Sequence, residues 1–98
     1  MTSQLIINIA EQPLPQLKKF LKQLGGERRI AILKRLTDGK DITITELAKE
    51  MDCGKANISQ QVSELEKAGL IIKQVSKTSG SNLKFIKPAY DEIIIKLK

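Results

Sequence analysis

The chain of 98 residues has no histidine, no tryptophan and a single cysteine, Cys53. A zinc site takes about four nitrogen or sulfur ligands, so we expect no metal, and we expect no other cofactor. One cysteine cannot form an internal disulfide bond, which favours a reducing compartment and a cytoplasmic location. The sequence also lacks a Gly-rich phosphate loop after a strand and a cysteine paired with a base. We therefore expect no enzymatic activity.

Aromatic residues and long apolar runs are also scarce. Only three side chains are aromatic, whereas proteins that bind RNA or single-stranded DNA usually stack bases on aromatic rings. No apolar run approaches the roughly 18 residues of a membrane span, so neither a membrane partner nor a signal peptide is expected. Positive charge is in excess, with 17 basic and 11 acidic residues and a net charge of +6. This composition favours duplex DNA as the partner.

The first half of the chain predicts helices after an ambiguous start. Residues 1–12 alternate as a strand would at Leu5, Ile7 and Ile9, but Ile6 interrupts the polar face. A helix then begins near Pro13 and ends at the glycine pair 25–26, because proline is tolerated in a first turn and glycine ends helices. A second helix is expected over residues 27–37, and its inward-facing residues are Ile30, Leu33 and Leu36.

The middle of the chain predicts two short helices joined by a tight turn, over residues 45–68. Thr43 and Glu46 have the spacing of a capping box, in which the two side chains satisfy free amides at a helix start. Asp52 falls where the turn needs a left-handed residue, which aspartate tolerates. A helix over residues 55–68 follows and is expected to stop at Gly69.

The last third predicts a β-hairpin over residues 70–86 with a polar turn at 76–82, and then a C-terminal helix over residues 88–98. The apolar stripe of that helix would be Tyr90, Ile93, Ile94 and Leu97. The whole chain, residues 1–98, therefore predicts one α+β domain that is mostly α-helical. Two short helices, a tight turn and a hairpin make a winged helix-turn-helix.

Four segments resemble the ArsR-type winged-helix regulators. These are Glu46–Ala48, Ile58–Ser59, Leu65–Ile71 and, in the helix before the DNA-binding unit, Arg29–Leu36. The resemblance implies that the helix from residue 55 is the recognition helix and that the loop at 76–82 is the wing. It also implies a dimer of identical chains.

The outward face of the recognition helix predicts the residues that meet DNA. Only its first two turns can lie deep in a major groove, and asparagine, glutamine and lysine can bind base edges or phosphates. The candidates are Lys55, Ala56, Asn57, Ser59, Gln60 and Gln61 on the helix, and Lys77, Thr78, Ser79 and Lys84 at the wing. A plain solvated helix face and a plain surface loop would have the same composition.

The first and last predicted helices carry more apolar surface than one small core needs, and contiguous apolar surface marks a contact. The expected dimer interface comprises Leu14, Leu17, Phe20, Leu21, Leu24, Tyr90, Ile93, Ile94 and Leu97. The alternative is that both helices close over the core of their own subunit.

The function that these patterns favour is a homodimeric repressor that binds specific double-stranded DNA. The alternatives are a winged-helix protein-interaction module and an architectural protein that binds DNA without sequence preference. Retention on duplex DNA, measured over a range of salt concentrations, distinguishes a DNA-binding protein from a protein-interaction module. The affinity of a phosphate-binding protein for DNA falls steeply as salt rises.

The shortage of ligands generates a prediction about metal content. Protein purified without an affinity tag should contain no stoichiometric zinc, because Cys53 is the only strong zinc ligand in the chain and is expected to pack as a small apolar residue. Elemental analysis checks this. One zinc ion per chain or per two chains would contradict it and would implicate Cys53 at a subunit interface.

Overall fold

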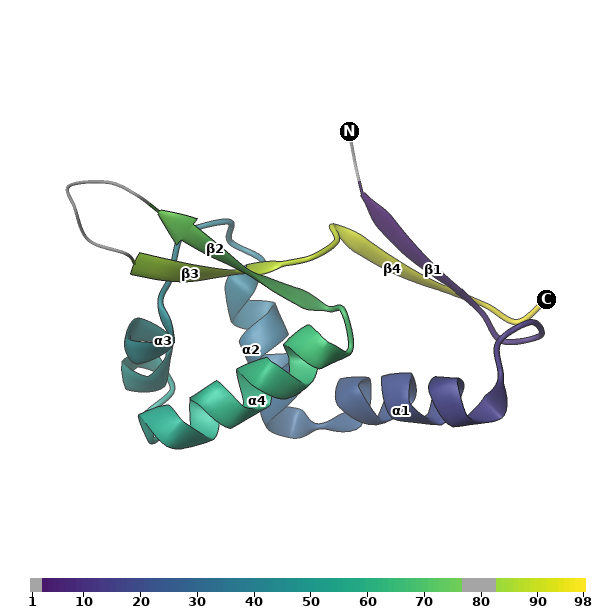
Figure 1. The fold of residues 1–98 in the computed structure, drawn as a ribbon, viewed down its shortest axis with the longest axis horizontal. Coiled ribbons are helices and arrows are strands. Elements are labelled where there is room, and N and C mark those ends of the chain that lie inside the picture. The colour runs from purple at the N-terminus through teal and green to yellow at the C-terminus, as the bar shows by residue number, and fades with distance from the viewer. Residues whose placement is uncertain (1–2, 77–82) are drawn as a thin grey trace.

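Four helices and two small β-sheets make up the fold in a computed structural model that describes residues 3–76 and 83–98 (Figure 1). The helices are α1 (Leu14–Gly25), α2 (Glu27–Leu36), α3 (Ile44–Glu50) and α4 (Lys55–Lys67). The strands β2 (Ile71–Ser76) and β3 (Leu83–Pro88) form an antiparallel hairpin. The strands β1 (Gln4–Asn8) and β4 (Glu92–Lys96) form a separate parallel pair. The helices and the hairpin confirm the predicted winged helix-turn-helix.

The predicted capping box, left-handed turn residue and helix stop are all present in the structure. The Thr43 hydroxyl accepts from the Glu46 amide at 3.2 Å, and the Glu46 carboxylate accepts from the Thr43 amide at 3.1 Å, which completes the capping box. Asp52 has a φ of 51°, so the turn between α3 and α4 does use a left-handed residue. Gly69, which follows the C-cap residue Ala68 of α4, has a φ of 79°, where a side chain would strain the backbone.

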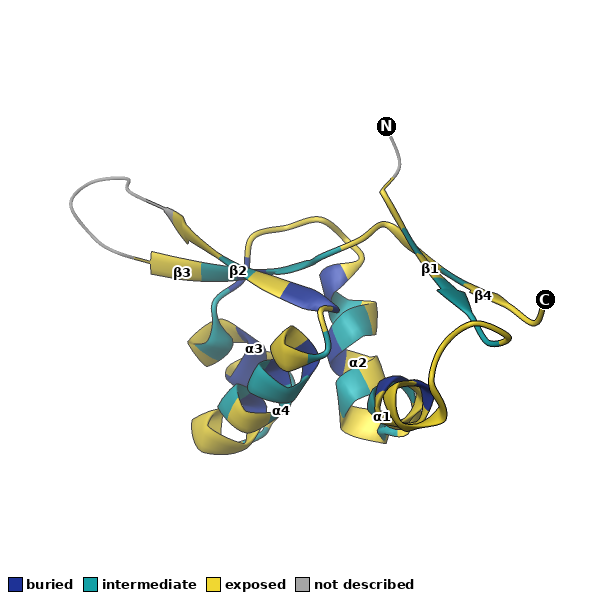
Figure 2. Ribbon diagram, turned by 45° about the vertical axis from the view of Figure 1, so that its right-hand side comes forward, coloured by how far each residue is buried: buried dark blue, intermediate teal, exposed yellow. Residues whose placement is uncertain are grey.

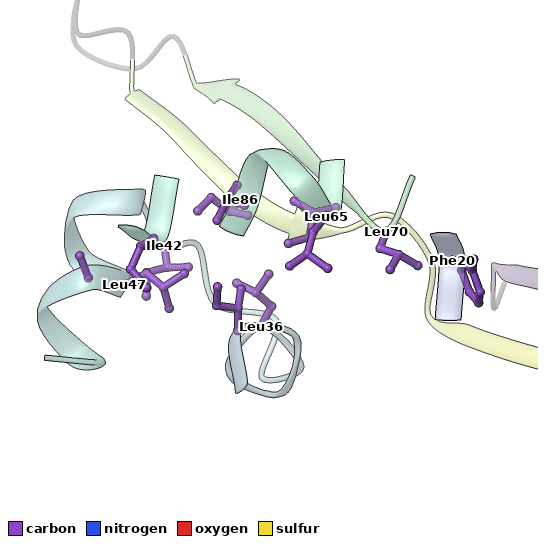
Figure 3. Packing of buried hydrophobic residues seen from close by; sticks show 12 residues of the cluster. Phe20, Leu36, Ile42, Leu47, Leu65, Leu70 and Ile86 are labelled. Atoms are coloured by element: carbon purple, nitrogen blue, oxygen red, sulfur yellow. The ribbon is translucent and has the colours of Figure 1, made fainter. Parts of the chain in front are cut away.

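The hydrophobic core lies between α2, α3, α4 and the hairpin (Figure 2). In close view, side chains from all of these elements converge (Figure 3). Its fully or almost fully buried members are Ile32, Leu36, Ile42, Leu47, Ala48, Ile58, Val62, Leu65, Leu70, Ile71 and Ile86. The Ile86 amide donates to the Ile42 carbonyl at 2.9 Å, so the segment before α3 is attached to the hairpin.

The prediction that Ile30 faces the core was wrong. Ile30 is 41% exposed, and Ile32 is fully buried in its place. The helix α2 carries apolar residues on more than one side, so their spacing alone does not select the inward face. Contact with α4 and β3 selects the face of Ile32 and Leu36.

The predicted C-terminal helix over residues 88–98 was also wrong, because the chain there forms β4. Ile93, Ile94 and Ile95 are three consecutive β-branched residues, which favour a strand. The strand pairs in register with β1, so that Ile94 lies beside Ile6. Within the ambiguous segment 1–12, residues 4–8 form a strand and a turn follows, and the strands β1 and β4 near the two ends of the chain lie side by side (Figure 1).

Among residues 3–76 and 83–98, no helix has the length and apolar character that crossing a bilayer requires.

The capping box predicts the effect of one substitution on stability. Thr43→Ala should lower the free energy of unfolding by about 1 kcal/mol, because the Glu46 amide loses its acceptor. Thermal or urea unfolding monitored by circular dichroism measures this. Thr45→Ala, two residues later and exposed within the first turn of α3, is the matched control and should cause no loss. An equal loss in both variants would contradict a role for the cap.

Candidate nucleic-acid interface

The orientation of α4 is set by its buried face. Ile58, Val62 and Leu65 are fully buried, so the opposite face of the helix must point to solvent. The first turns of α4 follow the turn from α3 and lie at one end of the domain, on the left in Figure 1. The end of the β2–β3 hairpin lies on the same side of the molecule, and the β1–β4 pair lies on the opposite side. One end of the domain therefore presents both the helix start and the hairpin.

Of the predicted residues on α4, four are exposed and two are half-buried. The exposed ones are Lys55, Ala56, Asn57 and Gln60, and the half-buried ones are Ser59 and Gln61. Gly54 caps the helix without a side-chain hydrogen bond. The first amides of α4 therefore have no side-chain acceptor at the N-cap, and the helix dipole makes this end attractive to an anion.

Asn57 is linked to α2. The Arg28 Nη1 donates to the Asn57 Oδ1 at 2.9 Å, and both side chains are exposed. A carboxamide oxygen has two lone pairs, so this bond leaves Asn57 one acceptor position as well as its two amide donors. The contact thus holds the side chain in place without consuming its capacity to bind a base.

Gln61 belongs to a different arrangement, which is centred on Arg29. The Arg29 guanidinium donates to the Gln61 Oε1 at 3.0 Å, to the Lys22 carbonyl at 3.1 Å and to the Gln23 carbonyl at 3.2 Å. A Cβ on Gly26 would lie 2.4 Å from the Arg29 Nη2, so glycine leaves the space that the guanidinium occupies. One side chain of α2 therefore joins the end of α1 to α4, and it holds the half-buried Gln61 side chain against α2.

Sequence reasoning missed these two links. The partners of Arg28 and Arg29 lie 29 and 32 residues away along the chain. No spacing rule connects residues at that separation. The only sequence signal was the pair of adjacent arginines at the start of a helix.

A third basic residue of α2 is engaged in ion pairs. Arg35 forms a two-pronged contact with the Glu50 carboxylate of α3 and a 2.6 Å ion pair with Asp38. The hydrogen bond from Arg35 lowers the pKa of Glu50 below its usual value. Arg35 thus joins α2 to α3 and is not a free cation for a phosphate.

The predicted wing residues are only partly visible. Lys77, Thr78 and Ser79 lie outside the described residues. Lys84 lies on β3 beside Val75 of β2 and is exposed.

The predicted dimer residues divide into three groups by burial. Leu17 and Phe20 are buried within the subunit itself, and Leu24 and Ile94 are half-buried. The exposed ones are Leu14, Leu21, Tyr90, Ile93 and Leu97, with Leu14 at 76% and Leu97 at 75%. Those from residue 90 onward lie on or beside a strand and not on a helix.

Cys53 lies in the turn between α3 and α4. It is half-buried against the core, and its Sγ donates to the Met51 carbonyl at 3.2 Å. In the part of the chain that the structure describes, no three histidine, cysteine, aspartate or glutamate side chains gather in a way that could hold a metal ion.

Comparison with known proteins agrees with this architecture. The model of a helix-turn-helix domain family matches residues 27–74. The crystal structure of Rv0081 from M. tuberculosis is similar, with a TM-score of 0.66 and 30% identity over 81% of this chain and 76% of that one. An ArsR family transcriptional regulator, RHA00566, has a TM-score of 0.62 and 27% identity over 79% of this chain and 74% of that one.

A third similar structure is the winged helix-turn-helix DNA-binding domain of Mb0332 from Mycobacterium bovis, which is homodimeric and a possible ArsR-family regulator. Its TM-score is 0.66 at 21% identity, over 78% of this chain and 66% of that one. A search of curated proteins found no match.

The geometry around Arg29 generates a prediction about stability. Arg29→Ala should lower the free energy of unfolding by about 2 kcal/mol, because the part-buried Gln61 oxygen and two carbonyls at the end of α1 lose their donor. Arg28→Ala, which removes one exposed hydrogen bond from the neighbouring position, is the matched control and should cost less than half as much. Urea unfolding of the two variants measures the difference, and equal losses would contradict the proposed link.

Proposed function

The chain belongs to the ArsR-like family of winged helix-turn-helix, DNA-binding transcriptional regulators, and on that basis we propose that it is a homodimeric repressor of specific promoters. The observation that carries the proposal is the polar, exposed start of α4, held outward by three fully buried residues on the opposite face. A recognition helix enters the major groove with its N-terminal residues, and those are the residues exposed here.

The side chains at the start of α4 have the chemistry for reading bases. Asparagine and glutamine bind adenine through two hydrogen bonds, so Asn57 and Gln60 are assigned to base edges. Lys55 can reach guanine acceptors or a phosphate. The bond from Arg28 orders Asn57 before DNA arrives, which reduces the entropy lost on binding. Gln61, which accepts from Arg29, is assigned to positioning α4 and not to direct contact.

The hairpin is proposed to contact the DNA backbone beside the recognition helix. Lys84 is exposed and is the second residue of β3, and the start of β3 lies on the same side of the domain as the start of α4 (Figure 1). Lys77, Thr78 and Ser79 are assigned to the same role from the sequence. Phosphate contacts of this kind fix the register of the protein on the duplex and give binding that weakens as salt rises.

The dimer is proposed from the homodimeric Mb0332 domain and from the apolar residues left exposed on this chain. A twofold dimer presents two recognition helices to two half-sites, which lie one turn of DNA, about 34–36 Å, or a multiple of that distance apart. The operator is therefore expected to be an inverted repeat, and occupancy of it would block a promoter.

Base reading by α4 is tested by substitution. Asn57→Ala or Gln60→Ala should weaken binding to a specific fragment by about 1–3 kcal/mol and change binding to random DNA little, because base contacts are made only at the specific site. The fragment comes from selection of bound DNA from the source genome, and fluorescence anisotropy measures both affinities. Gln16→Ala, an exposed glutamine on α1, is the matched control.

The outcomes separate the rival functions. Equal losses on specific and random DNA would remove Asn57 and Gln60 from base reading. Equal affinity of the intact chain for both DNAs would make it an architectural protein. No binding to duplex DNA at low salt would leave a protein-interaction module.

A further inference from the structure

β4 has a free edge that the helix-turn-helix unit and the hairpin leave unpaired. β4 has a strand neighbour on one side only, because the described residues place it in a sheet of two strands, β1 and β4. A two-stranded ribbon is marginally stable by itself, and an open edge is a template for another strand. Here the edge strand is also apolar at its centre, since Ile93 and Ile95 are exposed.

The backbone groups of Ile93 and Ile95 point to this free edge. The Glu92 amide donates to Ser3 and the Lys96 carbonyl accepts from Ile9, so residues 92, 94 and 96 face β1. Successive residues of a strand point their backbone groups to alternate sides, so residues 93 and 95 face away from β1. Outside that ladder, the described residues offer Ile93 and Ile95 no backbone partner.

The other edge of the ribbon, along β1, is partly closed. The Asn8 carbonyl accepts from the amides of Glu11 and Gln12 at 3.2 and 3.1 Å. These bonds belong to the turn that follows β1, and they use an acceptor that a further strand would need. The free edge of β4 is therefore the more available of the two.

We propose that β4 pairs antiparallel with β4 of a second copy of this chain, with the twofold axis at Ile94. The inference rests on the proposed homodimer and names the surface that forms it. In this register Glu92 lies opposite Lys96 of the partner subunit, and Lys96 lies opposite the partner's Glu92. β4 has the sequence Glu, three isoleucines and Lys, so two antiparallel copies can place the acidic end of each strand opposite the basic end of the other. Only the register centred on Ile94 brings Glu92 opposite Lys96 in both pairs.

The backbone agrees with that register. Ile93 and Ile95 become the residues that exchange both backbone hydrogen bonds across the interface, since they face the free edge. Residues 92, 94 and 96 then occupy the non-hydrogen-bonded pairs, whose Cα atoms are about 4.5 Å apart and whose side chains approach most closely. Glu92 accepts from Gln4 through Oε2 at 2.7 Å, which leaves Oε1 for a lysine. In the described chain Lys96 makes no ion pair of its own.

The same register gives exposed apolar residues a partner. It brings Leu97 of the partner subunit beside Asp91, at the rim of a hollow of about 470 Å³ between α2 and the start of β4. That hollow is lined by Leu33, Leu36, Tyr90 and Ile93, among others. Leu97 is 75% exposed in the single chain, so the dimer removes apolar surface that the monomer leaves in water.

Charge reversal tests the pairing. Glu92→Lys and Lys96→Glu should each weaken self-association by about tenfold, because each places two like-charged pairs across the interface. Mixing these two variants in equal amounts should restore tight association as a heterodimer, in which every cross-strand pair is again opposite in charge. Sedimentation equilibrium gives the association constants, and native mass spectrometry gives the share of heterodimer. Lys98→Glu is the matched control, since position 98 has no acidic residue opposite it.

Disulfide trapping tests the register without altering charge. In a Cys53→Ser background, Ile94→Cys should form a disulfide-linked dimer on mild oxidation, because position 94 lies opposite itself. Ile93→Cys should not, because two copies of residue 93 lie diagonally, about 7–8 Å apart, too far for a disulfide.

Each outcome has one interpretation. A heterodimer share above the statistical half, together with trapping at 94 and not at 93, supports the strand pairing. The pairing is overturned if the intact chain is a dimer but neither charge reversal changes the association constant, or if Ile93→Cys forms the disulfide-linked dimer as readily as Ile94→Cys. Either result leaves the proposed regulator in place. An intact chain that is monomeric at micromolar concentration overturns the homodimer itself.

Discussion

Burial of one face of α4 is the constraint on which the rest of the domain depends. Ile58, Val62 and Leu65 have no exposed surface, and they pack against α2, α3 and the hairpin. Burying three branched side chains contributes several kcal/mol, by an order-of-magnitude estimate of about 1.5–3 kcal/mol each. A rotation of the helix would expose them, so the polar face with Asn57 and Gln60 is held toward solvent by the core on the other side.

Polar side chains of α2 further fix the positions of the helices that pack around the core. Arg29 joins the end of α1 to Gln61 of α4, and Arg35 joins α2 to Glu50 of α3. α1 follows β1 of the β1–β4 ribbon along the chain, and α4 carries the proposed DNA-binding face, so the Arg29 contact joins the helix next to the proposed dimer surface to the proposed recognition helix.

The two ends of the molecule have different chemistry. The start of α4 carries exposed polar side chains and Lys55, and Lys84 is exposed on β3, which suits phosphates and base edges. The opposite end is a ribbon of two strands with apolar centres and polar or charged ends, which suits a second strand of the same kind. A dimer formed through that ribbon leaves both recognition helices free, so the two surfaces do not compete.

The sequence by itself determined the features that depend on neighbouring residues. The capping box at Thr43, the left-handed Asp52, the stop at Gly69 and the exposed start of α4 follow from local hydrogen bonding, backbone sterics and helical spacing. Only the tertiary structure decided the rest. The sequence predicts a helix in place of β4, because Tyr90, Ile93, Ile94 and Leu97 have helical spacing. A strand needs a partner strand, and the partner of β4 is β1, which lies 88 residues away along the chain. The inward choice of Ile32 over Ile30 and the capture of Gln61 by Arg29 likewise depend on which elements meet in space, and no local pattern carries that information.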